Sequence, residues 1–338
     1  MGKALPNETV TGSLAEHPAV KAWCQLQHRW NEPQRVEILR LKRKSAVFRL
    51  EGVGPGGAVI IAKRCPAATA KVERTIYEEF LARVPVPSLH CHGFLEEPDS
   101  ELCWLFLEEA RGVMYSPQRG DHRALAARWL GTVHCASLSA ELKALLPDRG
   151  PAHHLGLLRS SRTTLREHLA DNSSLPGEDD ALLRRIVECC DVMESRWAEL
   201  QTICEVLPHT VVHGDFVIKN VRIKDAPAGP ALLVFDWELG GRGAPAVDLA
   251  QFVGLTVSPD LAVHGSVLKR VYPHLDVPDI QRAAEWGNLL RLVDEMYWAT
   301  LLMQFGRYEL VLKPILTLRL YEPGLVAGLQ AIAGSEHD

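Results

Sequence analysis

The stretch TVVHGDFVIKNVRI, residues 210–223, mixes large apolar residues with a few isolated polar ones. His213, Gly214 and Asp215 interrupt an apolar run, and Lys219-Asn220 interrupts it again. A surface loop would not carry so many valines and isoleucines, and a fully buried strand would not carry Asp215 or Asn220. The stretch therefore predicts a site in which two polar side chains, five residues apart, lie in apolar surroundings.

The residues that follow predict a β-hairpin. The segments NVRIKD and ALLVFDWE are separated by APAGP, a Pro/Gly turn between two β-prone runs. Asp215 and Asn220 stand at the start of this hairpin and Asp236 at its far end. Because a hairpin brings its two ends together, we expect these three side chains at one edge of a lobe.

Their chemistry indicates phosphoryl transfer. A carboxylate and an amide oxygen are hard ligands that suit Mg²⁺, and a second carboxylate can accept a hydroxyl proton. Metal ions that bridge phosphates, with an Asp that orients an alcohol, are the parts of that reaction. Lys63 ends the apolar strand AVIIAK, and Glu73 on the next helix is expected to pair with it over the phosphates, although Glu78 and Glu79 share that helix.

The rest of the chain predicts an α+β fold with two lobes. Residues 36–112 read as five strands and one helix, whereas helical periodicity dominates from residue 113. We expect a small β-rich lobe at 1–112 and a larger, mostly helical lobe at 113–338 that contains the hairpin. Within it, residues 179–204 predict one long core helix.

A glycine motif in the first lobe is better explained as a turn. Gly52-x-Gly54-x-x-Gly57 would need a following helix to bind a dinucleotide, but a strand follows. We therefore expect a hairpin turn there. The turn LKRKSA, residues 41–46, is the better phosphate loop, with its backbone N–H groups and Ser45 as donors, and a solvated basic turn is the alternative.

The composition of the chain bears on which kinds of partner it can bind. A formal charge of −5 over 338 residues gives no basic footprint for nucleic acid, and no run approaches the ~20 apolar residues of a membrane span. Eight cysteines without C-x-x-C spacing and an N-terminus without a signal-peptide pattern favour a cytoplasmic protein. Residues 113–338 carry 22 basic and 28 acidic side chains (22 − 28 = −6). A cationic small-molecule partner explains this balance, and a solvated acidic surface explains it equally well.

In this order and spacing, His213-Gly214-Asp215-x4-Asn220 followed by Asp236-Trp237-Glu238 resembles the aminoglycoside phosphotransferase and choline kinase family, which has the protein-kinase-like fold. Further matching segments span most of residues 36–250: IIAK, ERTIYEEFL, VPVP, LFLEEARG, RWLGTVH and APAVDLAQF. The joint pattern is far more specific than H-G-D alone.

The resemblance implies a role for each matching residue. Asp215 would be the catalytic residue, Asn220 and Asp236 would bind Mg²⁺, and Lys63 with its partner Glu73 would contact the phosphates of ATP or GTP. A hinge at about 106–112 would bind the base through backbone groups of Phe106, Leu107, Glu108 and Glu109. His213 and Asp248 would support the catalytic loop structurally.

The acceptor is expected to be a small hydroxylated molecule, because the chain lacks the long activation segment with which protein kinases dock peptides. An aminoglycoside or related amino-sugar compound is the leading expectation, and choline, ethanolamine or another metabolite is the alternative. A catalytically silent nucleotide-binding protein is the alternative of another class. The candidate acceptor-binding residues are Glu238, Asp294, Glu295 and Trp298, since acids suit amines and aromatic rings suit quaternary ammonium groups.

Overall fold

The computed structural model describes residues 8–10, 13–42, 44–98, 100–171, 175–227 and 229–334. The chain divides into two compact units. Unit 1 comprises Met1–Val113, Ala140–Leu146 and Asn220–Gly240, and unit 2 comprises Met114–Ser139, Pro147–Lys219 and Gly241–Asp338. The division differs from two continuous lobes, because the segments 140–146 and 220–240 pack with the N-terminal part of the chain.

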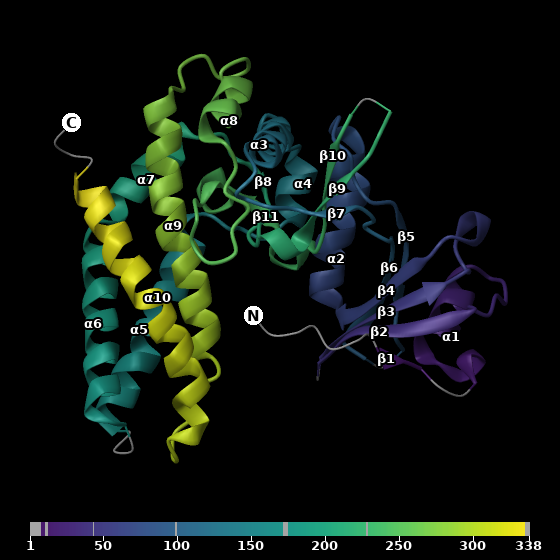
Figure 1. Cartoon of the computed structure of the whole chain (residues 1–338), viewed down its shortest axis with the longest axis horizontal. Coiled ribbons are helices and arrows are strands. Elements are labelled where there is room, and N and C mark those ends of the chain that lie inside the picture. Colours follow the sequence, from purple (N-terminus) through teal and green to yellow (C-terminus); the bar gives the residue numbers. More distant parts are fainter. Residues whose placement is uncertain are drawn as a thin grey trace. The chain divides into compact units, whose positions relative to one another are not determined.

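Unit 1 contains a six-stranded antiparallel sheet with the strand order β1-β2-β3-β4-β6-β5 (Figure 1). Five of these strands lie in the region for which the sequence predicted five, and β1 adds an edge strand from outside it. Pro55–Gly57 forms the turn between the antiparallel β3 and β4, which confirms the hairpin reading of the glycine motif. The strands are β1 (Glu8–Thr9), β2 (Arg35–Lys42), β3 (Ser45–Glu51), β4 (Ile60–Pro66), β5 (Cys91–Glu96) and β6 (Leu102–Glu108).

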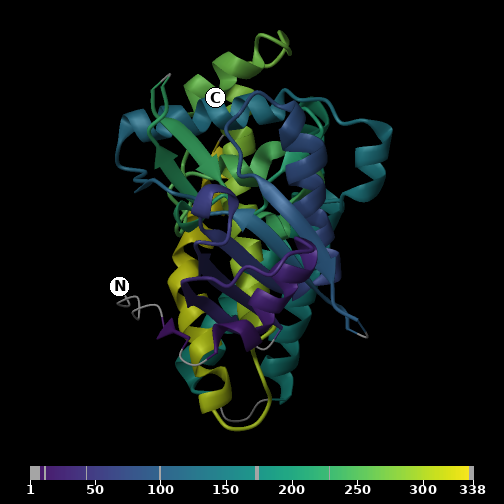
Figure 2. The same cartoon turned by 90° about the vertical axis from the view of Figure 1, so that its right-hand side faces the viewer.

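Alternation along the strands gives this sheet two different faces. Trp104 and Phe106 of β6 point to the face that the helix α1 (Pro18–Leu26) covers, where Trp23 lies 5.2 Å from Phe106 between ring centroids. In Figure 2 this helix is the purple coil beside the purple strands. Cys103 points to the opposite face and packs with the helix α2 (Ala67–Thr75). Helix α1 was not expected from the sequence.

The predicted hairpin is present in unit 1. Strands β9 (Val221–Lys224) and β10 (Ala231–Val234) pair antiparallel, with Val221 opposite Val234. The short strand β7 (Val113–Met114) completes a three-stranded sheet with them. The Phe235 N–H donates to the Asn220 carbonyl oxygen at 3.0 Å. The residue before β9 and the residue after β10 are therefore hydrogen-bonded to each other at the open end of the hairpin. A short helix, α4 (Ala140–Leu145), also belongs to this unit and contacts α2.

Unit 2 is mainly helical, and its long helices α5, α6, α9 and α10 lie side by side (Figure 1). A two-stranded sheet joins β8 (Thr210–Val212) to β11 (Gly241–Gly243). The apolar core surrounds α9, which packs against both α5 and α10. The helices are α3 (Gly120–His134), α5 (Pro151–Asp171), α6 (Gly177–Ser195), α7 (Trp197–Val206), α8 (Leu261–Leu268), α9 (Val277–Thr300) and α10 (Glu309–Gly334).

The single long helix predicted over 179–204 is wrong in detail, because the chain forms α6 and α7 with a break between them. Arg196 leaves the helical region with φ −100° and ψ 10°, and its guanidinium bonds to Glu199 in the first turn of α7. In the described part of the chain, no helix is both long and apolar enough to cross a bilayer.

Candidate active site

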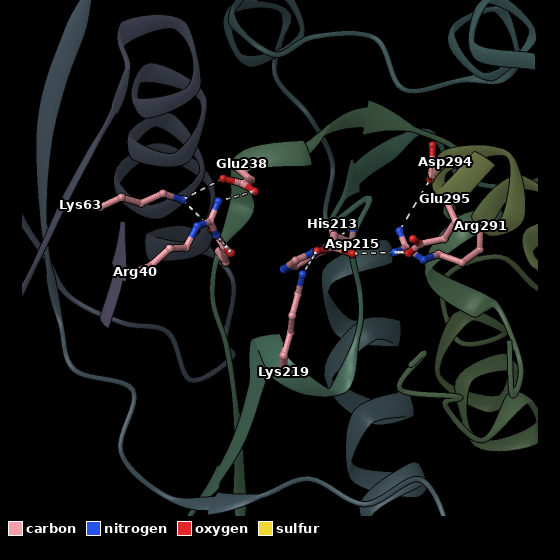
Figure 3. Close-up of polar contacts among 10 residues, drawn as sticks. Arg40, Lys63, His213, Asp215, Lys219, Glu238, Arg291, Asp294 and Glu295 are labelled. Atoms are coloured by element: carbon pink, nitrogen blue, oxygen red, sulfur yellow. Dashed lines mark hydrogen bonds and ion pairs between the residues drawn. The ribbon is translucent and has the colours of Figure 1, made fainter. Parts of the chain in front are cut away.

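A buried lysine in unit 1 faces three carboxylates, and we call this group the Lys63 centre: Lys63, Glu73, Asp236 and Glu238. Lys63 on β4 forms an ion pair with Glu73 on α2. Its Nζ also lies 2.6 Å from Asp236 Oδ1 and 3.5 Å from Glu238 Oε2. Figure 3 shows Lys63 and Glu238 pointing toward each other. One cation thus joins the sheet, the helix and the end of the hairpin.

The structure settles which glutamate of the helical segment pairs with Lys63. Glu73 is fully buried, whereas Glu78 and Glu79 lie at the surface side of the segment. Glu78 accepts from Arg74 at 2.7 Å, and Glu79 accepts from Arg83 at 2.8 Å.

The charges of the Lys63 centre depend on one another. Burial by itself would lower the pKa of Lys63, but the charges of Glu73, Asp236 and Glu238 outweigh it and raise that pKa well above its usual value. The lysine therefore stays charged. Burial raises the pKa of Glu73 to about 7, against the opposing effect of Lys63. The centre keeps its charge only because its members lie so close together.

Asp236 has an unusual backbone conformation. Its φ of 66° and ψ of 61° lie in the left-handed region, which side chains other than glycine rarely adopt. The next residue, Trp237, is fully buried and begins a short helical turn that contacts α2. Non-glycine residues in this region cluster at functional sites. Arg40 of β2, which the sequence analysis did not select, lies 3.9 Å from Asp236 and 3.8 Å from Glu238.

A cavity of about 380 Å³ lies beside the Lys63 centre, within the size range of small-molecule pockets. Its apolar lining includes Val47, Ile61 and Leu107, and its charged lining includes Lys63, Glu73 and Asp236. These three strand residues alternate with core residues, so they belong to the sheet face opposite α1.

Three of the four expected base-binding residues line this cavity: Leu107, Glu108 and Glu109. The side chain of Phe106 instead points into the core on the other face. Ser45 stands opposite Lys42 at the end of the β2–β3 hairpin and is not among the described residues that line the cavity. Arg43, in the same turn, lies outside the described residues.

The donor chemistry of the hairpin end fits a magnesium ion. The structure pairs the ends of β9 and β10, so it brings Asn220 and Asp236 to one end of the hairpin, and Asn220 is buried. Within the described ranges no cluster of three His, Cys, Asp or Glu side chains could hold a metal by itself. Mg²⁺ does not need such a cluster, because it binds through one or two carboxylates together with waters and phosphates.

In unit 2, Asp248 fixes the loop that follows β8. The His213 N–H donates to Asp248 Oδ2 at 2.7 Å, and the Gly214 N–H donates to Oδ1 at 3.0 Å. Gly214 has a φ of 74°, a conformation that glycine adopts without strain. The Asp215 N–H in turn donates to His213 Nδ1 at 3.2 Å. The backbone leading to the Asp215 carboxylate is therefore held by hydrogen bonds.

A second buried cation faces three carboxylates in unit 2, and we call this group the Arg291 centre: Arg291, Asp215, Asp294 and Glu295 (Figure 3). Arg291 Nη2 lies 3.0 Å from Asp215 Oδ1 and forms an ion pair with Glu295. Its Nη1 lies 3.9 Å from Asp294 Oδ2. Arg291 was not among the residues expected from the sequence, although an arginine three and four residues before two acids on one helix is a signal that the sequence offers.

The expected acceptor residues are distributed over both units. Glu238 belongs to the Lys63 centre, whereas Asp294, Glu295 and Trp298 share one face of α9 through helical spacing. Burial raises the pKa of Asp294 to about 7, despite the nearby charge of Arg291. Glu295 is partly buried, and Trp298 is 49% exposed. The two acids therefore already face a cation of the chain itself.

The fold is that of the protein-kinase-like phosphotransferases. An ethanolamine kinase from Plasmodium vivax matches with a TM-score of 0.57 at 14% identity, over 88% of this chain and 86% of that one. The streptomycin–ATP complex of APH(2″)-IIa matches with 0.56 at 13%, over 89% and 97%. A choline kinase from Cryptosporidium parvum Iowa II matches with 0.53 at 12%, over 88% and 92%.

The chain belongs to the phosphotransferase enzyme family (APH), whose sequence pattern it matches over residues 36–286. This match confirms the family resemblance of the H-G-D motif and supports a small-molecule phosphotransferase. A search among curated proteins found no match.

Proposed function

We propose that this protein transfers the γ-phosphate of ATP, or of GTP, to a hydroxyl group of a small molecule. The observation that carries the proposal is the buried Lys63, paired with Glu73 and Asp236 beside a cavity of about 380 Å³. A charged lysine with a second carboxylate at its side is the arrangement with which kinases bind nucleotide phosphates. The family match and the kinase-like fold support the same reaction class.

The donor nucleotide would occupy the cavity of unit 1. Lys63 would contact its α- and β-phosphates, and Glu73 would keep the lysine in place. Leu107, Glu108 and Glu109 would meet the base. The Glu108 N–H already donates to the His90 carbonyl oxygen at 2.9 Å, so the backbone bond to the base would come from a neighbouring residue.

Asn220 and Asp236 would hold Mg²⁺, and Glu238 is near enough to Lys63 to join the same charge network. When bound, the ion would neutralise charge on the β- and γ-phosphates. The Asp236 carboxylate would then bind the metal as well as Lys63, so its ion pair with Lys63 would weaken. The left-handed backbone at Asp236 supports this metal-binding role, because strained residues of this kind cluster at functional sites.

Asp215 would orient the acceptor hydroxyl and receive its proton. The acceptor O–H bond breaks, a P–O bond forms between the acceptor oxygen and the γ-phosphorus, and the bond from that phosphorus to the bridging oxygen breaks. ADP and the phosphorylated acceptor are the products, and the proton passes from Asp215 to solvent. His213 and Asp248 would keep the loop in place through the bonds described above.

The leading acceptor is an aminoglycoside or a related amino-sugar compound. Three carboxylates facing one guanidinium in the Arg291 centre support an acceptor that carries amines. Choline or ethanolamine is the second candidate, because half-exposed Trp298 lies on the same helix face and could contact a quaternary ammonium group.

The test combines turnover with nucleotide binding. ATP and GTP consumption would be measured against aminoglycosides, amino sugars, choline and ethanolamine, and thermal shift would compare Mg²⁺-ATP with ATP alone. We expect extra stabilisation by Mg²⁺ and phosphorylation of one acceptor class. A chain that binds nucleotide without Mg²⁺ dependence and phosphorylates none of these acceptors would instead be the catalytically silent binding protein.

Two matched substitutions separate the proposed roles. Asp236→Asn should abolish turnover and remove the extra stabilisation by Mg²⁺. Asp215→Asn should lower kcat by about 100-fold or more, the usual range of general-base assistance, and leave Mg²⁺-ATP affinity close to normal. The opposite pattern, with Mg²⁺ dependence lost only in Asp215→Asn, would show that the two roles are reversed.

A further inference from the structure

The two carboxylate oxygens of Asp215 face cations of different character. Oδ1 lies 3.0 Å from Nη2 of Arg291, whose side chain is only 9% exposed. Oδ2 lies 3.1 Å from Nζ of Lys219, whose side chain is 61% exposed. Arg291 comes from α9, whereas Lys219 follows Asp215 in the same loop. One oxygen is therefore fixed from the core, and the other meets a solvated side chain.

Arg291 is itself held in position. Glu295, one helical turn further along α9, binds the same Nη2 group that contacts Asp215. The neighbouring helix residues Leu290 and Leu292 are buried in the core of unit 2. The guanidinium is planar and carries its donors in a rigid fork, so it fixes the direction of a bond that an ammonium group would leave free.

We propose that Arg291 is a positioning residue for phosphoryl transfer. It holds Oδ1 of Asp215 and thereby presents Oδ2 to the acceptor hydroxyl, while the exposed Lys219 moves aside. The inference rests on the proposed function and adds to it a residue that touches neither acceptor nor nucleotide. It also assigns the proton of the acceptor hydroxyl to one oxygen, Oδ2.

A double-mutant cycle at Arg291 and Asp215, with kcat as the measured quantity, tests the positioning role directly. Arg291→Gln is introduced into the wild-type chain and into the Asp215→Asn chain, and Arg291→Lys serves as the conservative variant. Arg282→Gln is the matched control, because Arg282 lies on the same helix, is exposed and pairs with Asp279, three residues before it. Each variant is first shown to be folded by its thermal transition.

If Arg291 acts through Asp215, the two substitutions are not additive. We expect Arg291→Gln to lower kcat by about 100-fold with Asp215 present, but less than about 2-fold in the Asp215→Asn chain. The nucleotide KM should stay within about 2-fold of wild type, Arg291→Lys should recover part of kcat, and Arg282→Gln should change nothing.

Two results would overturn the inference while the proposed function stands: a kcat for Arg291→Gln close to wild type, or the same fold-loss in both backgrounds. If Arg291→Gln does not fold, Arg291→Lys enters the same cycle. An equal fold-change of kcat in the two backgrounds then overturns the inference, and a loss seen only with Asp215 present supports it. A wild-type chain that phosphorylates none of the acceptors is a different failure, because it removes the proposed function and the positioning role together.

Discussion

The Lys63 and Arg291 centres share one charge pattern but use different cations. Each places a single buried cation against three carboxylates: Glu73, Asp236 and Glu238 in unit 1, and Asp215, Asp294 and Glu295 in unit 2. The first borders a cavity and joins a strand, a helix and a hairpin. The second draws its cation and two of its acids from a single helix.

The choice of cation fits these surroundings. An ammonium group is a compact point charge on a flexible stem, so Lys63 can exchange carboxylate contacts for phosphate contacts at little geometric cost. A guanidinium binds in fixed directions, so Arg291 suits the orientation of a carboxylate rather than the capture of a ligand. The same charge pattern can thus serve binding in one unit and orientation in the other.

The largest effect is expected when the Lys63 centre loses its cation. Lys63→Met leaves Glu73, which is 0% exposed, without its partner, and breaking such a buried pair typically costs about 3–5 kcal/mol of unfolding free energy. Lys63→Met combined with Glu73→Gln should recover much of this loss, because the fully buried member of the pair is then neutral and the remaining carboxylates of the centre are partly exposed. Urea unfolding of both variants measures the difference, and equal losses would mean that the pair does not set the stability of unit 1.

A medium effect is expected from pH at Asp294, whose pKa rises from 3.8 to about 7 on folding. Between these values the folded state binds more protons than the unfolded state, so this group makes the wild-type chain less stable as pH rises. Asp294→Asn removes that slope. The stability of the variant relative to wild type should therefore increase by about 3 kcal/mol from pH 5 to pH 8.

The neighbouring His154 has the opposite slope. Its Nε2 lies 3.8 Å from Asp294 Oδ1, and burial lowers its pKa to about 4. It binds fewer protons in the folded state between pH 4 and 6.5, so its contribution to stability grows with pH in that window. Urea midpoints at pH 5 and pH 8, measured for the wild type and for Asp294→Asn, separate the contribution of Asp294 from that of His154. A pH-independent difference would contradict the raised pKa.

The smallest effect separates two roles for Glu295. If it holds Arg291 in place, Glu295→Gln should lower kcat by about 3–10-fold, the equivalent of one weakened charged hydrogen bond, and leave the acceptor KM unchanged. If it binds an amine of the acceptor, KM should rise and kcat should hold. Steady-state kinetics with a cationic and a neutral acceptor distinguish the two, and the second result would move Glu295 from the positioning apparatus to the acceptor pocket.

The sequence predicted the parts of the site that depend on local order. The hairpin between Asn220 and Asp236 follows from two β-prone runs and a Pro/Gly turn, and pairing of Val221 with Val234 confirms it. Lys63 could be matched with a glutamate because strand and helix are consecutive. Which glutamate pairs could not be read, since three lie on one segment and only burial separates Glu73 from the others.

Other features depend on packing between distant segments, which local patterns do not report. Arg291 meets Asp215 across 76 residues of chain (291 − 215 = 76), and Arg40 meets Asp236 across an even longer separation. The strand β1 and helix α1 lie in a region whose pattern was not read as regular structure. The direction of Phe106, by contrast, was available from strand alternation, because Trp104 and Phe106 share one face and Leu107 the other.

The left-handed backbone at Asp236 also limits which residues the position can tolerate. That conformation admits glycine readily and asparagine or aspartate at modest cost, whereas other side chains lose about 1–2 kcal/mol. The contact with Lys63 independently requires a carboxylate, which only aspartate and glutamate supply. Aspartate is the one residue that meets both conditions. Saturation mutagenesis at 236 should therefore leave a single functional amino acid, with glycine and asparagine the best tolerated for folding alone.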